Sequence, residues 1–131
     1  MANPSSFYYD ISFLLDTNQV DLAQKYVLEN EDTLNGDQYG LMLTLAQRFE
    51  KENRFLVLTI IYRELLESIL RRAQSKYYQY GVRYLKKLEK LAPQVSDWQG
   101  VLPHELYFKK IAETHARKKS FWDKYEREEQ K

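Results

Sequence analysis

The chain contains no cysteine among its 131 residues. The absence of thiols excludes disulfide bonds and thiolate metal sites, and it favours a reducing compartment such as the cytoplasm. No run of about 18 apolar residues is present, so we expect no membrane-spanning helix. Residues 1–6 have neither a basic region nor an apolar core, so we also expect no signal peptide.

Catalytic and metal-binding groups are also scarce. The only histidines, His104 and His115, are eleven residues apart, which places their rings about 16 Å apart along a helix. Two ligands of one zinc ion lie within about 4 Å of each other, so we expect no metal site. Ser12, Ser68 and Ser75 have no nearby histidine, and the four glycines form no phosphate-binding loop. The sequence therefore predicts neither an enzyme nor a cofactor.

The length and composition suit one domain. A chain of this length buries roughly two thirds of the surface that its unfolded form exposes. A content of 44% hydrophobic and 30% charged residues is typical of globular proteins. We expect one domain over residues 1–131, with the charged residues 126–131 frayed.

The net charge of +1 conceals an uneven distribution. Residues 1–70 hold five Lys and Arg against eleven Asp and Glu, whereas residues 71–131 hold fifteen against eight. The first half is therefore acidic and the second half basic. A dipolar molecule can orient a partner or pair head to tail with itself, and a basic half is compatible with nucleic-acid binding. The alternative is that the two halves simply attract each other within one domain.

The strongest structural signal is an antiparallel helical hairpin over residues 45–70. Apolar residues recur every three or four positions on both sides of Asn53, a residue that suits the left-handed end of a helix. The second half of this hairpin is apolar on more than one face, so neighbours must cover it from two sides. No strand pattern is present, and the sequence predicts an all-α fold.

Turn signals divide the chain into about six to seven helices. Ser5 or Ser6 is expected to cap the first helix and Asn18 the second, which ends before the turn at Asn35 and Gly36. The later helices are expected over about 37–52, 54–72, 77–92, 103–117 and 120–128. Pro93 ends one of these helices, and Pro103 is expected as the first residue of the next.

Two of these helices carry specific expectations about the core. On the helix over 77–92, the apolar spacing predicts a buried face of Tyr77, Gly81, Tyr84, Leu88 and Leu91. The last helix is short, and isolated helices below about 12 residues are marginal in water, so it must dock on the body. We expect Trp122 to be its largely buried anchor, with Tyr125 on the same face and Phe121 at the edge.

A faint internal repeat predicts how the hairpins stack. Five positions beginning at Asn18 resemble five beginning at Asn53, an offset close to the 34-residue period of tetratricopeptide repeats. Leu58 stands where that repeat has a small residue, and no proline closes the hairpin. The sequence therefore predicts antiparallel hairpins in a tetratricopeptide-like array.

A second resemblance covers about residues 65–125. The residues that carry it are Tyr80, Gly81, Val82, Arg83, Tyr84, Leu85, Leu91, Ala92, Pro93, Asp97, His104, Tyr107, His115, Ala116, Arg117, Lys118, Lys119, Ser120, Phe121 and Trp122. They resemble the carboxyl end of a group of large uncharacterised bacterial proteins, some related to proteins with a SWIM-type zinc finger. The resemblance implies a helical domain of unknown function without catalytic residues. Without cysteine, this chain is expected to be an excised domain or a short stand-alone relative.

Two functions remain open at this stage. The leading hypothesis is a non-enzymatic module that binds another protein or another part of a parent chain; the sequence leaves its oligomeric state open. The alternative is nucleic-acid association through the basic face of residues 72–90 and 109–119. The candidate interaction residues are Arg72, Lys76, Arg83, Lys87, Lys90, Arg117, Lys118 and Lys119.

Overall fold

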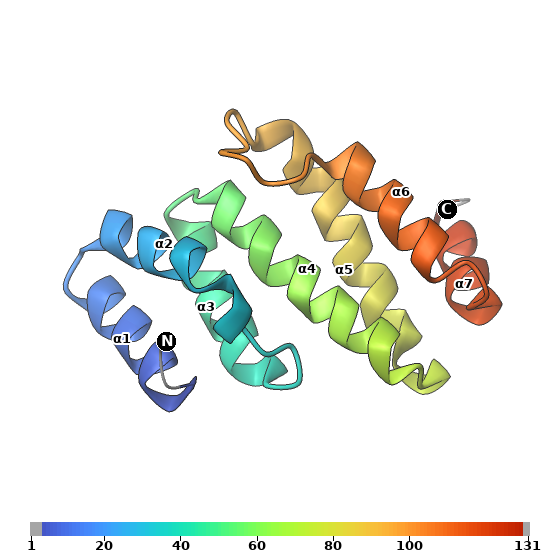
Figure 1. Cartoon of the computed structure of the whole chain (residues 1–131), viewed down its shortest axis with the longest axis horizontal. Coiled ribbons are helices and arrows are strands. Elements are labelled where there is room, and N and C mark those ends of the chain that lie inside the picture. Colours follow the sequence, from blue (N-terminus) through green and yellow to red (C-terminus); the bar gives the residue numbers. More distant parts are fainter. Residues whose placement is uncertain (1–3, 130–131) are drawn as a thin grey trace.

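The computed structural model describes residues 4–129, and this part of the chain is a stack of helices without a strand (Figure 1). The α-helices are α1 (Pro4–Asp16), α2 (Val20–Glu29), α3 (Tyr39–Lys51), α4 (Phe55–Arg72), α5 (Tyr78–Leu91), α6 (His104–Thr114) and α7 (Lys119–Glu129). Three short 3-10 helices connect them: η1 (Glu31–Thr33), η2 (Ser75–Tyr77) and η3 (Ala92–Gln94). The predicted all-α class and number of helices are confirmed.

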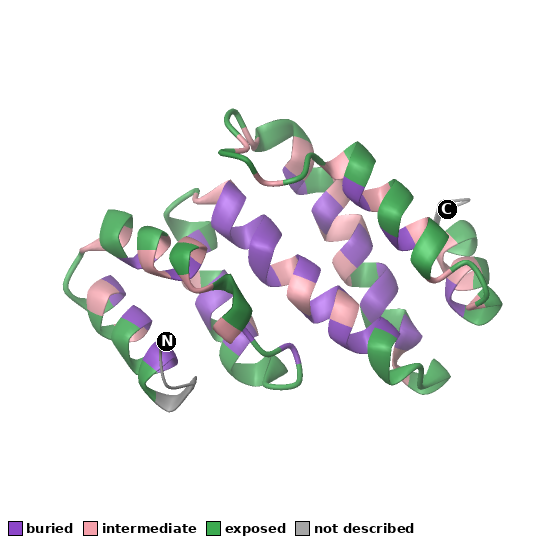
Figure 2. Cartoon of the chain, viewed as in Figure 1, coloured by how far each residue is buried: buried purple, intermediate pink, exposed green. Residues whose placement is uncertain are grey.

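Helix α4 lies at the centre of the stack (Figure 2). Twelve of its eighteen residues are buried, and they point in every direction around the helix axis. Helices α3 and α5 both pack along it, each running antiparallel to it, and α1 pairs with α2 at one end. The prediction that the second half of the 45–70 hairpin needs cover from two sides is confirmed.

Two hydrophobic clusters meet on α4. The first joins α1, α2 and α3 to the amino-terminal part of α4, and Phe7, Phe49 and Ile61 are among its fully buried members. The second joins the carboxyl-terminal part of α4 to α5, α6 and α7, and it contains Leu66 and Phe121. Burial of such side chains stabilises each by about 1.5–3 kcal/mol relative to exposure, so both ends of the stack depend on one helix.

Left-handed residues end several of the helices. Asn53 has φ 56° at the turn between α3 and α4, as predicted, and Ala73 has φ 53° after α4. Asn18 also has a positive φ, of 60°, so it belongs to the turn after α1. The prediction that Asn18 caps α2 is therefore wrong, and Gln19 occupies that position without a side-chain cap.

The other helix boundaries differ from expectation by a few residues. Helix α1 already begins at Pro4, so Ser6 lies inside it, and the side chain of Ser5 lies outside the described residues. Pro103 precedes α6 as its cap residue instead of occupying the first helical position. Residues 126–131 were expected to fray, but helix α7 continues to Glu129. Residues 130–131 lie outside the described residues.

The tail helix docks on the body as expected, but Phe121, which was expected at the edge, is its fully buried residue. Phe121 is fully buried and meets the Tyr78 ring edge-on at a centroid distance of 5.6 Å. Trp122 is only half-buried, and its indole Nε1 donates a hydrogen bond of 2.9 Å to the backbone carbonyl of His115. The indole therefore packs over the α6–α7 connection while Phe121 enters the core.

None of the helices described here, from α1 to α7, is long and apolar enough to span a membrane. This agrees with the absence of long apolar runs in the sequence.

The roles of the two tail aromatics can be separated by mutation. Phe121→Ala should lower the free energy of unfolding by about 3–5 kcal/mol because it leaves a cavity between α5 and α7. Trp122→Ala should cost clearly less, and Leu106→Ala, at a residue that is 54% exposed, should change stability by no more than about 0.5 kcal/mol. Urea unfolding followed by circular dichroism measures all three, and a larger loss for Trp122 than for Phe121 would contradict the observed packing.

Candidate interaction surfaces

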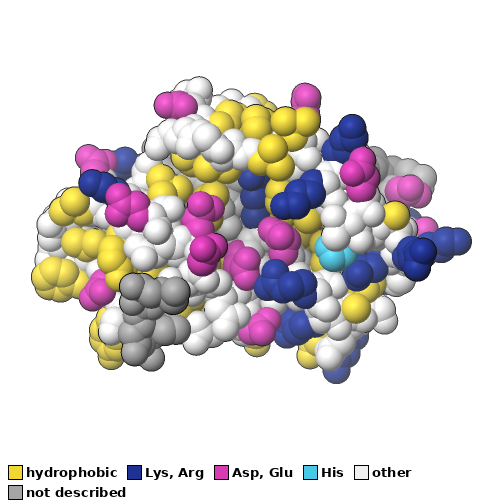
Figure 3. All heavy atoms as spheres, viewed as in Figure 1, with side chains coloured by type: hydrophobic (Ala, Val, Ile, Leu, Met, Phe, Trp, Pro, Cys, Tyr) yellow, Lys and Arg dark blue, Asp and Glu magenta, His cyan; other side chains and the backbone are white. Residues whose placement is uncertain are grey.

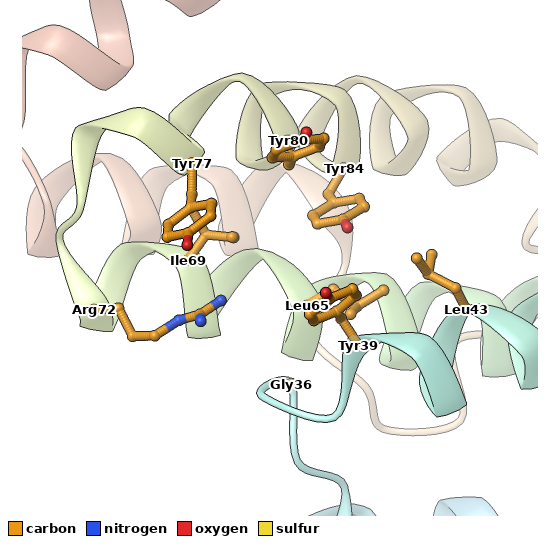
Figure 4. Close-up of a pocket in the computed structure, with 9 residues that line it drawn as sticks. All are labelled: Gly36, Tyr39, Leu43, Leu65, Ile69, Arg72, Tyr77, Tyr80 and Tyr84. Carbon is orange, nitrogen blue, oxygen red and sulfur yellow. The ribbon is translucent and has the colours of Figure 1, made fainter.

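One depression on the molecule is lined mainly by tyrosines (Figure 4). It has a volume of about 290 Å³ and lies where the start of α3, the second half of α4 and the start of α5 meet. We call it the tyrosine groove, and its lining residues are Gly36, Tyr39, Leu43, Leu65, Ile69, Arg72, Tyr77, Tyr80 and Tyr84. Its floor is apolar, and its walls carry phenol groups and one guanidinium.

Helix α5 and the preceding η2 bring three of these tyrosines to the groove, Tyr80 and Tyr84 from α5 and Tyr77 from η2. Its buried face contains Tyr78, Val82 and Leu85, so the face expected from the sequence is correct only in part. Tyr77 and Tyr84 were expected in the core, but they are half-buried at the edge of that face and line the groove. Val82 and Leu85 are buried in the cluster that α5 forms with α4, α6 and α7, whereas Tyr77 and Tyr84 pack against that cluster and are only partly buried.

Much of the aromatic surface of the groove is open to solvent. Tyr39 is 59% exposed and Tyr80 is 41% exposed, while Tyr84 contacts the Tyr62 ring at a centroid distance of 5.9 Å. Burial raises the pKa of the Tyr84 phenol, with a further rise from the neighbouring Tyr62. The exposed rings and the apolar floor together form a surface that another molecule can cover.

Basic side chains surround the same groove. The Arg72 guanidinium lies 5.4 Å from the centre of the Tyr77 ring, and its Nε is 3.8 Å from a carboxylate oxygen of Asp37. The Lys76 ammonium lies 5.1 Å from the Tyr77 ring, and Arg83 lies 5.6 Å from the Tyr80 ring. Cations over aromatic faces are attracted to the ring quadrupole, and they give the groove a positive rim.

The loop before α3 reaches the groove through a close backbone approach. The Gly36 amide donates to the Glu64 carboxylate at 3.3 Å, and the Ser68 hydroxyl donates to Asp37 at 2.5 Å. A Cβ at Gly36 would lie 2.5 Å from both the Glu64 carbonyl oxygen and the Ser68 Cβ. Only glycine lets the loop lie this close to α4, and this contact sets the position of Tyr39 at the groove.

A second depression contains three of the eight basic residues named from the sequence. It has a volume of about 670 Å³ between α5 and α7, and we call it the basic groove. Its lining residues are Gln79, Val82, Arg83, Lys86, Lys87, Lys90, Lys124, Arg127 and Glu128. Three of the predicted residues, Arg83, Lys87 and Lys90, therefore meet three that were not among the candidates, Lys86, Lys124 and Arg127.

The remaining candidate residues lie elsewhere. Arg72 and Lys76 lie beside the tyrosine groove, and Arg117 and Lys118 lie in the connection between α6 and α7. Lys119 is the first residue of α7. Arg117, Lys118 and Lys119 do not line the basic groove. The structure therefore divides the eight candidates into separate groups instead of one continuous face.

A third depression has a mixed charge. It lies between η1, the middle of α4 and the start of α6, has a volume of about 500 Å³, and is lined by four carboxylates together with Arg63, Lys110 and Tyr107. On the face shown in Figure 3, acidic side chains gather in the middle and basic ones toward α6 and α7. Burial and the neighbouring Asp32 raise the pKa of the Glu31 carboxyl.

Both histidines are half-buried. Burial lowers the pKa of both imidazoles, and the ring of His104 lies 6.2 Å from that of Phe108. The Nδ1 atoms of His104 and His115 are buried without a hydrogen-bond partner. Within the described part of the chain, no group of three or more metal-ligating side chains comes together.

Comparison with known proteins identifies the family. Residues 3–124 match the model of a family of unknown function, DUF6880, so the chain belongs to that family. No curated protein matches the sequence, and no solved structure matches it. The expectation of a domain of unknown function is confirmed, and the family match covers nearly the whole chain.

The contact of the loop with α4 can be tested with a matched pair of glycines. Gly36→Ala should lower the free energy of unfolding by about 1–3 kcal/mol because its Cβ would overlap backbone and Cβ atoms of α4. Gly40→Ala, in α3 with open space around its Cβ, should stabilise the protein by about 0.5 kcal/mol. Urea unfolding measures both, and equal effects of the two substitutions would rule out the proposed steric reason.

Proposed function

We propose that this chain is a non-enzymatic module that binds another protein, or another part of a longer chain, through the tyrosine groove. The supporting observation is the combination of an apolar floor, exposed tyrosines and a basic rim in one depression. Tyrosine and arginine are enriched in protein interfaces because they offer a large contact area together with hydrogen bonds. Exposed apolar patches on folded proteins often mark sites where another molecule binds.

The surrounding scaffold suits this role. The groove is formed mainly by the central α4 and by α3 and α5, which pack against it, so its walls are held by the hydrophobic core and not by a long loop. We further propose that the hairpins form a tetratricopeptide-like array and that the protein works in a reducing, cytoplasmic environment, as the lack of cysteine favours. We also propose that the chain is related to the large bacterial proteins described above, some of which are related to proteins with a SWIM-type zinc finger.

Site-specific crosslinking tests the groove directly. A photoreactive phenylalanine analogue in place of Tyr80 or Tyr39 should give a discrete crosslinked product in the cells that produce the protein, because both rings are exposed in the groove. The same analogue at Leu106, which is 54% exposed on α6, is the control and should not give that product. Gel electrophoresis and mass spectrometry detect the adducts, and their absence from both groove positions would contradict the proposal.

The basic groove favours nucleic-acid association as a second candidate function. It contains six Lys and Arg side chains and one glutamate, an excess of positive charge that suits a phosphate backbone. Four of its cations already interact within the chain: Lys87 with Glu50 at 2.7 Å, Lys86 with Glu89 at 3.7 Å, Arg83 with the Tyr80 ring, and Arg127 with the backbone carbonyl of Asp123 at 3.4 Å. These internal contacts reduce the charge available to a ligand, which is why this function ranks second. The predicted contribution of residues 109–119 lies outside this groove.

Salt dependence tests the second candidate. If the basic groove binds single-stranded RNA or DNA, affinity should fall steeply with salt, and Lys90→Glu with Lys124→Glu should reduce the slope of log K against log salt by about 1 per lost contact. Lys87 is left intact because its charge reversal would place two carboxylates together at Glu50. Fluorescence anisotropy measures binding, and no binding of either polymer at low salt would remove this function.

A further inference from the structure

The outward face of α1 carries two large exposed side chains. Tyr9 is 80% exposed and Phe13 is 61% exposed, and they are four residues apart, so they lie one turn apart on the same side of the helix. The opposite side of α1, with Phe7, Ile11 and Leu15, is buried against α2 and α3. Hydrophobic side chains are visible at this end of the molecule in Figure 3.

This face is unusual for the end of a helical stack. A terminal helix in a stacked array normally presents a polar outer surface, because no further neighbour covers it. Helix α1 instead presents an aromatic pair in the geometry with which amphipathic helices enter apolar grooves. The face therefore has the chemistry of a surface that is covered in an assembly.

The charge around this face is negative. Asp10 and Asp16 flank the aromatic pair, and residues 4–37 contain seven Asp and Glu against one Lys. Their carboxylates already contact the Tyr26 hydroxyl and the Arg48 guanidinium, respectively, and both aspartates remain exposed. Two α1 faces would repel each other because of their like charge, whereas a positively charged surface would attract this one.

The tyrosine groove is complementary to the α1 face in its aromatic surface and in its charge. Its apolar floor and exposed Tyr39 and Tyr80 rings can pack against an aromatic pair, and its rim carries Arg72, Lys76 and Arg83. We propose that the groove of one molecule binds the α1 face of a second copy of the same chain, head to tail. This inference rests on the proposed function and identifies the partner of that groove.

The proposed contact joins two different surfaces of the molecule. Each copy therefore carries one α1 face and one groove, and unless the rotation closes a ring, successive copies add in open chains. This geometry differs from a symmetric dimer, in which the same surface of both copies would meet, and the difference can be measured.

Two variants that each lack one surface provide the test. Phe13→Glu places a charge in the aromatic pair of α1, and Tyr39→Ala combined with Tyr80→Ala removes the exposed rings of the groove. All three positions are exposed, so circular dichroism should show unchanged helix content. Leu106→Ala, at an exposed residue of α6, is the control and should associate like the wild type.

Sedimentation velocity at rising protein concentration gives the outcome. The wild-type mass should increase with concentration and fall again at high salt, and each variant alone should remain monomeric. An equimolar mixture of the two variants should form a dimer and grow no further, because one intact α1 face then meets one intact groove. A wild type that stays monomeric, or a mixture that stays monomeric while the wild type associates, would overturn the inference.

The same data separate this inference from the proposed function. If crosslinks from Tyr80 join the chain to a different protein while the wild type stays monomeric, the groove binds a protein and the second copy is excluded as its partner. If crosslinks from Tyr80 join two copies of the chain through α1, both statements are supported. If Tyr80 and Tyr39 give no crosslink and the chain stays monomeric, both are overturned.

Discussion

The burial of α4 is the constraint on which the rest of the structure depends. Twelve of its residues are buried, and they lie on all sides of the helix, so each side requires a neighbour. Removing the apolar side chains among them from water supplies much of the free energy that stabilises the stack. Leu58 and Ile61 belong to the cluster with α1, α2 and α3, whereas Leu66 and Leu70 belong to the cluster with α5, α6 and α7. Both candidate grooves lie between helices of this stack. The tyrosine groove lies on α4 itself, and the basic groove lies between α5 and α7.

The fold class could be predicted because it follows from short-range periodicity. The spacing around Asn53 predicts two helices and the turn between them, and the apolar excess of residues 55–61 predicts cover on two sides. The boundaries and the tail anchor were harder, since they depend on distant residues. Phe121 and Trp122 are adjacent in sequence, and the burial of Phe121 depends on residues distant in sequence, among them Tyr78 on α5.

The candidate surfaces were predictable only in part, for the same physical reason. A basic stripe on α5 can be recognised from spacing, but its meeting with Lys124 and Arg127 depends on how α7 crosses α5. The tyrosine groove was missed because Tyr77 and Tyr84 match the helical spacing of core residues. The abundance of tyrosine was the only signal, since a chain with eleven tyrosines cannot bury all of them.

A buried arginine shows that apolar packing alone does not place the carboxyl-terminal helices. Arg63 on α4 is 7% exposed, and its Nη2 donates a 2.6 Å hydrogen bond to the Leu102 carbonyl in the loop before α6. Its guanidinium also lies 4.1 Å from the Tyr107 ring, and burial lowers its pKa even though nearby Glu67 and Glu31 oppose the shift. A buried cation is costly unless it is paired, so this charge favours the one arrangement in which the loop carbonyl and the Tyr107 ring both reach it. Because Tyr107 belongs to α6, and α6 leads directly into α7, the position of the basic groove depends on a polar contact of α4 as well as on its apolar faces.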